Sequence, residues 1–158
     1  MHMSIDSVML VLVVTNLLLL GFSQLRSCVR AVAVQGFALG LLPLLVRPGG
    51  PTVWTVLVVL VTIGLKGVVF PRLLLGALRD ADVRREKRPA VGYSISMLMG
   101  FVALAGAAWL SARLPVFPAS PSTMAAPVSF FMIFVGLFII VSRNHAVNQI
   151  VGYLVLEN

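Results

Sequence analysis

Residues 52–78 have the sequence TVWTVLVVLVTIGLKGVVFPRLLLGAL and set the architecture of this chain. A helix that crosses a bilayer needs about 20 mostly apolar residues, and this stretch exceeds that length. Trp54 at its start is typical of an interfacial anchor. Lys66 is the charge in the middle of the run, and Pro71 after it predicts a kink. The stretch therefore predicts a membrane-spanning helix with a lysine near its centre.

The composition of the whole chain agrees with a membrane protein. Of its 158 residues 59% are hydrophobic and only 11% are charged, with a mean hydropathy of +1.05. A water-soluble domain of this size cannot bury so many apolar side chains. We expect an all-α polytopic membrane protein with five complete transmembrane helices and the start of a sixth, forming a single membrane domain over 1–158. The expected helices are 8–25, 29–46, 52–78, 93–110, 128–141 and 147–158.

The distribution of basic residues predicts the orientation in the membrane. The net charge is +7, but the twelve Lys and Arg form no basic face interleaved with aromatic residues, which argues against nucleic-acid binding. Five of them lie in the polar loop 79–89, and more lie after the odd-numbered helices than after the even-numbered ones. The positive-inside rule then places that loop in the cytoplasm and the N-terminus outside. We expect a multi-pass protein of the cell's inner (plasma) membrane.

No motif of a soluble enzyme occurs in the sequence, and metal-binding residues are few. There is no P-loop, no G-x-G-x-x-G, no H-E-x-x-H and no G-x-S-x-G. Cys28 is the one cysteine, expected in a short cytoplasmic turn beside Arg26 and Arg30, and the histidines are His2 and His145. We therefore expect no catalytic residue, metal or cofactor in this chain.

Lys66 is the first candidate for chemistry. It lies about fourteen residues into its span, roughly 20 Å along the helix axis, which makes snorkelling to either surface difficult. Such a lysine faces a protein interior or a hydrated cavity, where burial disfavours its charged form and equips it to load and release a proton. The alternative is a structural lysine that donates to backbone carbonyls at the Pro71 kink. Arg72, nearer the boundary, is expected to be a snorkelled anchor.

Glu157 is the second candidate. It lies about ten residues into the last expected helix, or roughly 15 Å deep, which is near mid-membrane. A carboxyl there suits a group that takes and releases protons. The alternative is a carboxylate that pairs with a basic residue of a partner. Tyr153 and Asn158 are expected neighbours, although Asn158 should point to a different helix face.

His145 is a weaker third candidate for the proton relay. It belongs to a polar cluster at the start of the last helix, with Asn144, Asn148 and Gln149. The simpler interpretation is that Asn144 caps the helix. Because a histidine changes charge near neutral pH, His145 is also suited to deliver protons to Glu157.

Two segments of the sequence resemble motifs of a known family. Ser142-Arg143-Asn144, followed by Gln149-Ile150-Val151-Gly152-Tyr153-Leu154-Val155-Leu156-Glu157-Asn158, closely resembles the C-terminal signature of hydrogenase-4 component E, with its Q-x-x-G-Y-x-x-x-E-N pattern. The segment from Lys66 to Pro71 is similar to that family's K-x-x-x-x-P. The resemblance in helix order and in these two motifs spans the whole chain. The C-terminal motif is the more specific of the two.

The resemblance implies a membrane subunit of formate hydrogenlyase or a related group 4 [NiFe] hydrogenase complex, with no redox centre of its own. Its partners would be antiporter-like and other membrane subunits of a complex-I-like assembly. Its last helices would be similar to complex I subunit K, with Glu157 as the carboxylate of a proton path and Lys66 on the same polar axis. Since that family continues past its E-N, we expect a longer native chain, or a neighbour that covers Asn158.

Two other functions stay open at this point. The chain is either a proton-translocation subunit, a structural scaffold whose charges pair with partner subunits, or a subunit of a multi-subunit cation/proton antiporter. The sequence leaves open whether the ion is H⁺ or Na⁺, and which electron donor the complex uses.

Overall fold

The computed structural model describes residues 2–22, 24–46, 52–80, 91–114, 122–143 and 146–158, and nearly all of these residues are helical. The helices are α1 (His2–Gly21), α2 (Leu25–Val46), α3 (Val53–Thr62), the π-helix η1 (Ile63–Val69), α4 (Phe70–Asp80), α5 (Tyr93–Arg113), α6 (Ala125–Ser142) and α7 (Ala146–Glu157). The expectation of an all-helical fold is confirmed for the described part of the chain.

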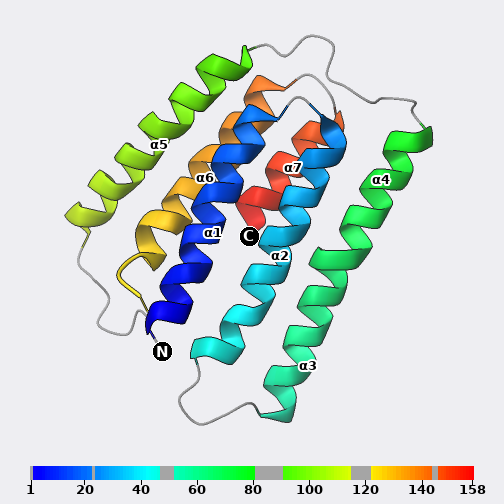
Figure 1. Ribbon diagram of the computed structural model, residues 1–158, viewed down its shortest axis with the longest axis vertical. Coiled ribbons are helices and arrows are strands. Elements are labelled where there is room, and N and C mark those ends of the chain that lie inside the picture. The colour runs from blue at the N-terminus through cyan, green and yellow to red at the C-terminus, as the bar shows by residue number, and fades with distance from the viewer. Residues whose placement is uncertain (1, 23, 47–51, 81–90, 115–121, 144–145) are drawn as a thin grey trace.

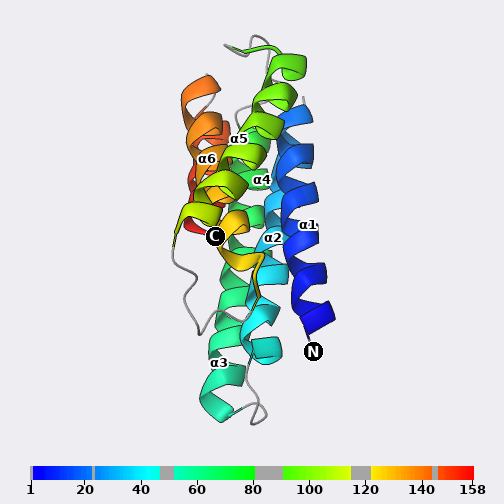
Figure 2. The ribbon, with the colours of Figure 1, turned by 90° about the vertical axis from the view of Figure 1, so that its left-hand side faces the viewer.

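Successive helices run alternately up and down, and α1, α2, α6 and α7 lie between α5 on one side and α3 and α4 on the other (Figure 1). Helix α1 packs against α2 and α6, and α7 packs against the same two helices, so α1, α2, α7 and α6 close a four-helix bundle. Helix α5 packs outside this bundle against α1 and α6, as Figure 2 also shows. The continuous rod α3–η1–α4 packs on the other side, against α2.

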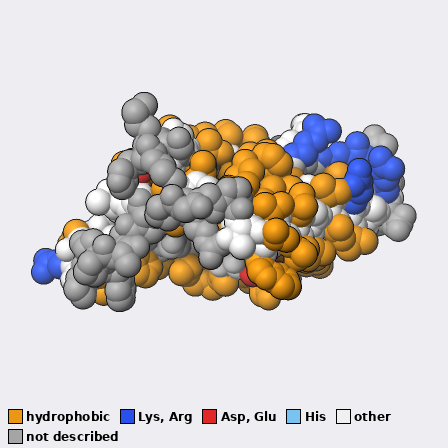
Figure 3. All heavy atoms as spheres, turned by 90° about the horizontal axis from the view of Figure 1, so that it is seen from below, with side chains coloured by type: hydrophobic (Ala, Val, Ile, Leu, Met, Phe, Trp, Pro, Cys, Tyr) orange, Lys and Arg blue, Asp and Glu red, His pale blue; other side chains and the backbone are white. Residues whose placement is uncertain are grey.

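The lengths and apolarity of the helices fit a membrane protein. Four of them are long and apolar enough to cross a bilayer: Leu25–Val46, Val53–Ala77, Ser94–Arg113 and Ala125–Ser142. The two outer helices expose most of their apolar side chains, because only 6% of the rod and 17% of α5 is buried. Hydrophobic side chains cover much of the described surface in Figure 3. Such a surface is stable in hydrocarbon or against other apolar protein.

The first connection differs from the sequence expectation. Helix α1 ends at Gly21 and α2 already begins at Leu25, so the expected turn around Cys28 is helical. The reason is the apolar stripe of α2, which buries Leu25, Cys28 and Val29 in its first turns. Arg26 and Arg30, one turn apart, lie on the exposed face. Cys28 is therefore a core residue, 6% exposed, and not part of a cytoplasmic turn.

Of the other helix bounds, the end of α2 at Val46 and the start of α5 at Tyr93 are as expected, and the rest shift by one to six residues. Helix α1 begins at His2, α5 continues to Arg113, and α6 extends over Ala125–Ser142. Helix α4 contains residues 79 and 80 of the expected cytoplasmic loop, whereas residues 81–89 of that loop lie outside the described residues.

Candidate functional site

Lys66 lies near the middle of the rod, thirteen residues after Val53 and fourteen before Asp80. At about 1.5 Å per residue it is roughly 20 Å from either end. It belongs to η1, where the α-helical hydrogen-bond pattern changes to the wider π pattern. The Phe70 N–H donates to the Leu65 carbonyl, five residues back. Segments of π-helix are often found at functional sites.

Pro71 explains why the helix widens at this place. Proline has no N–H to donate, and its ring collides with the carbonyl four residues earlier in a regular α-helix. The carbonyl at that position belongs to Gly67, which is inside η1. The wider π turn relieves this collision before the α-helix resumes. The expected kink is thus realised as a π-helical segment on the N-terminal side of Pro71.

Two glycines of α2 hold η1 close to the bundle. A Cβ added to Gly36 would lie 2.8 Å from the Cβ of Lys66 and 3.2 Å from its carbonyl oxygen. A Cβ added to Gly40, one turn later, would lie 2.5 Å from the side chain of Ile63. The pair forms a small-x-x-x-small contact of the kind common between membrane helices. Sequence reasoning missed both residues, although their spacing of four was the available signal.

A second pair of glycines positions α7. A Cβ on Gly152 would lie 2.8 Å from the Gly136 carbonyl oxygen, and a Cβ on Gly136 would lie 2.8 Å from the Gly152 carbonyl oxygen. The backbones of α6 and α7 therefore meet at this point without intervening side chains. This contact sets the position of α7 along α6, and the C-terminus lies about halfway along the bundle (Figure 1).

The two expected relay residues meet at that depth. Lys66 Nζ lies 3.2 Å from Glu157 Oε1 and donates to Asn158 Oδ1 at 3.1 Å. The side chains of Lys66 and Glu157 are 23% and 43% exposed, so the pair is partly accessible from outside the helices. Asn158 was expected to point to a different helix face, but its side chain and that of Glu157 both reach Lys66. The backbone N–H of Asn158 still donates to the Leu154 carbonyl at 3.1 Å, in the helical pattern. Tyr153 is 59% exposed.

Further polar side chains lie at a similar level in the four-helix bundle. Thr15, Asn16 and Gln35 interrupt the apolar faces of α1 and α2, and Gln35 Nε2 donates to Thr15 Oγ1 at 3.1 Å. These polar residues lie between two separate clusters of buried apolar side chains, because Leu12 of α1 belongs to one cluster and Leu19 to the other. Gln35 directly precedes Gly36, the glycine that contacts Lys66. We call Thr15, Asn16, Gln35, Lys66, Glu157 and Asn158 the polar layer.

Arg143 has a structural position that the sequence did not reveal. It follows α6, is only 4% exposed, and its Nη2 donates to the Leu20 carbonyl at 3.1 Å. That carbonyl belongs to the last turn of α1, where helical donors are lacking. From the sequence, Arg143 was one of the basic residues after an odd-numbered helix and a member of the C-terminal motif. In the structure it joins the ends of α1 and α6.

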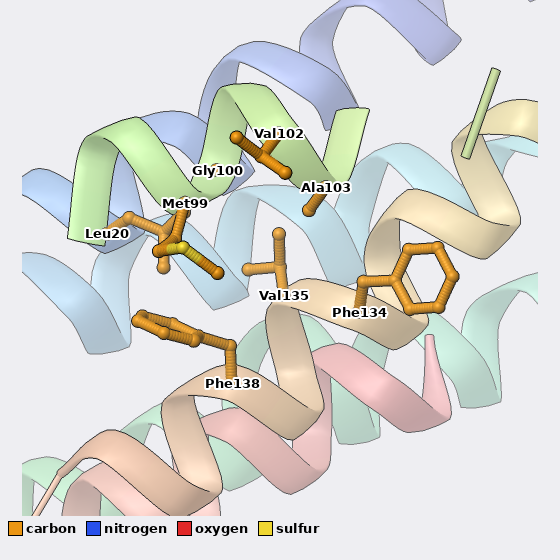
Figure 4. Close-up of a pocket in the computed structure, with 8 residues that line it drawn as sticks. All are labelled: Leu20, Met99, Gly100, Val102, Ala103, Phe134, Val135 and Phe138. Atoms are coloured by element: carbon orange, nitrogen blue, oxygen red, sulfur yellow. The ribbon is translucent and has the colours of Figure 1, made fainter. Parts of the chain in front are cut away.

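An apolar pocket of about 220 Å³ lies elsewhere, between α1, α5 and α6. Figure 4 shows its lining, which is Leu20, Met99, Gly100, Val102, Ala103, Phe134, Val135 and Phe138. None of these side chains is polar, so this pocket offers hydrocarbon surface and no group for proton or metal chemistry.

The remaining site predictions are limited by the described residues. His145 and Asn144, the third relay candidate and the expected cap, both lie outside them. Within the described residues, no group of three or more His, Cys, Asp or Glu is arranged to hold a metal ion.

Fold and site together define a helical membrane protein in which Lys66, at mid-height of the outer rod, pairs with Glu157 of α7. No family model matches the chain, and no solved structure matches it. The chain is 32% identical over 154 residues to "Uncharacterized protein Rv0085" of Mycobacterium tuberculosis (strain ATCC 25618 / H37Rv). The match covers 93% of this chain and 67% of that protein. The chain therefore belongs to the same family as the mycobacterial protein.

Proposed function

We propose that this chain is a membrane subunit of a multi-subunit hydrogenase or complex-I-like oxidoreductase, in which Lys66 and Glu157 relay protons. It would lie in the inner membrane with the Arg79 end of α4 in the cytoplasm, and would contribute no catalytic residue or redox centre. The observation that carries this proposal is the 3.2 Å pair between Lys66 and Glu157 near the middle of a membrane-length rod.

The chemistry of the pair suits proton transfer. Charged groups at the bilayer centre are costly, and those that persist usually line ion or proton pathways. The ammonium group of Lys66 donates directly toward the carboxylate, so a proton that moves between them leaves two neutral groups. The two side chains are also partly exposed, so that water or a partner's side chain can reach them.

The resemblance to hydrogenase-4 component E supports the same proposal. The two motifs that carry it lie far apart in sequence, yet Lys66 from one and Glu157 from the other form the ion pair. Gly152, from the C-terminal motif, forms the contact that sets the depth of Glu157. In such a complex the exposed apolar faces of the rod and of α5 would contact antiporter-like subunits or lipid.

Replacement of Glu157 by Gln tests the relay. The amide oxygen of Gln still accepts from Lys66, but it cannot take up a proton near neutral pH. The complex, purified with its partner subunits and reconstituted in vesicles, should assemble and turn over its electron donor while the proton gradient falls to the passive leak. Arg72→Gln is the matched control, because it removes an exposed charge from the same rod. A full gradient in Glu157→Gln would exclude the relay.

One observation favours the scaffold function as the alternative. Lys66 binds two acceptors at the end of α7 and so ties this helix to the rod. If this tie is the whole function, Lys66→Glu and Glu157→Lys should each lose assembly, and the exchanged pair should regain both assembly and gradient. A relay predicts that the exchanged pair assembles without a normal gradient. A cation/proton antiporter differs from both because no nickel-site subunit would be encoded beside it.

A further inference from the structure

Two buried oxygen atoms of the polar layer have no hydrogen-bond partner among the described residues. They are Asn16 Oδ1 and Gln35 Oε1. Both residues are 0% exposed. Buried amide oxygens in proteins almost always accept a hydrogen bond from protein or from ordered water. Each of these two therefore calls for a donor inside the bundle.

The neighbouring atoms fix which end of each amide is the oxygen. Thr15 Oγ1 lies 2.7 Å from the Val11 carbonyl, to which its hydroxyl donates. The Thr15 oxygen must then accept at its 3.1 Å contact with Gln35, so the NH₂ end of Gln35 faces it. Asn16 Nδ2 donates to the Leu12 carbonyl at 2.9 Å, and only the NH₂ end can do so. An exchange of O and N would break these bonds, so both oxygens keep their places.

The hydrogen-bonding atoms of Asn16 and Gln35 that are still without a partner suit a water molecule. Each NH₂ group has used one of its two hydrogens, so the two amides together offer two acceptor oxygens and two further N–H donors. A buried water makes about three hydrogen bonds, within a range of two to four, and uses both donors and acceptors. A cation can use only the oxygens. We propose that Asn16 and Gln35 bind internal water between α1 and α2, within the polar layer.

This water would lie in a particular setting. The Gln35–Thr15 hydrogen bond joins α1 to α2 at this level, and Gln35 is adjacent to the glycine whose backbone contacts Lys66. The interior of the bundle is then hydrated near the depth of the ion pair, on the other side of α2 from η1. The proposal stands whether or not Lys66 relays protons, because it depends only on the two amides.

Radiolytic labelling tests for this water in the full chain held in lipid nanodiscs. In H₂¹⁸O, X-ray pulses convert bound water to hydroxyl radicals that oxidise the side chains beside it. Leu12 and Val32, one turn from the two amides and only 1% and 4% exposed, should acquire ¹⁸O. Phe131 is 0% exposed and intrinsically more reactive, so it is the internal control for a dry core.

A double variant, Asn16→Leu with Gln35→Leu, should lower the labelling of Leu12 several-fold. Ser96→Ala is the matched control, because it removes a buried hydroxyl that already donates to the Gly92 carbonyl. Labelling of Leu12 no greater than that of Phe131 in the unaltered protein would overturn the proposal, even where the double variant does not fold. Labelling that changes when Na⁺ and K⁺ are replaced by choline would show a bound cation and would overturn it as well.

Discussion

The contact between α2 and η1 gives a quantitative prediction for Gly36→Ala. The added Cβ would lie 2.8 Å from the Lys66 Cβ and 3.1 Å from its backbone carbonyl carbon. Carbon atoms in contact prefer about 3.5–4.0 Å, so the rod must move away by roughly 0.7–1.2 Å. These neighbours are backbone and Cβ atoms, which cannot swing aside as the end of a side chain can. We therefore expect a loss of about 1–3 kcal/mol in stability, the usual cost of overpacking.

Gly64→Ala is the matched control for this prediction. Gly64 also belongs to η1, but a Cβ added there meets nothing within 4 Å. Its effect on stability should stay within about 0.5 kcal/mol, as for other substitutions away from packed contacts. Equilibrium unfolding by SDS in mixed micelles, followed by circular dichroism, measures both variants. If Gly36→Ala unfolds at the same SDS fraction as Gly64→Ala, the close approach of α2 and η1 is refuted.

Two further predictions concern the positions of α7 and α1. Gly152→Ala should weaken the packing of α7 on α6, because the added Cβ would lie 2.8 Å from the Gly136 carbonyl oxygen. Gly106→Ala is the control and should have no such effect, because a Cβ added there meets nothing within 4 Å. The sensitivity of the C-terminal helix to protease, measured in both variants, tests this prediction. Arg143→Met should lower the free energy of unfolding by about 1–3 kcal/mol, because the Leu20 carbonyl loses this donor. The same SDS unfolding measures the effect. Unchanged stability would show that the 3.1 Å hydrogen bond contributes nothing.

The local sequence was sufficient to predict the helical elements. Apolar runs of membrane length, separated by polar or proline-rich stretches, predicted the order and nature of the helices with bounds correct to within six residues. The central position of Lys66 followed from counting along one such run. These properties depend on length and hydropathy, which act on each segment by itself.

Other features were beyond prediction from a single segment. The start of α2 was misplaced because Arg26 and Arg30 suggested a turn, although on a helix they share the exposed face while Cys28 faces the core. The exact form of the Pro71 kink depends on how the backbone relaxes, and a π turn is one of several solutions. Arg143 was counted as a loop charge, but only its contact with Leu20 shows that it is buried.

The sequence by itself determined that this is a helical membrane protein, and that Lys66 and Glu157 are charges placed deep within apolar runs. Tertiary structure alone decided that these two charges meet, because residues so far apart in the chain are brought together by two glycine contacts. Gly36 allows η1 to lie close to α2, and Gly152 allows the backbone of α7 to meet that of α6. Close packing of backbones depends on which helices become neighbours, and no local pattern of residues specifies that choice.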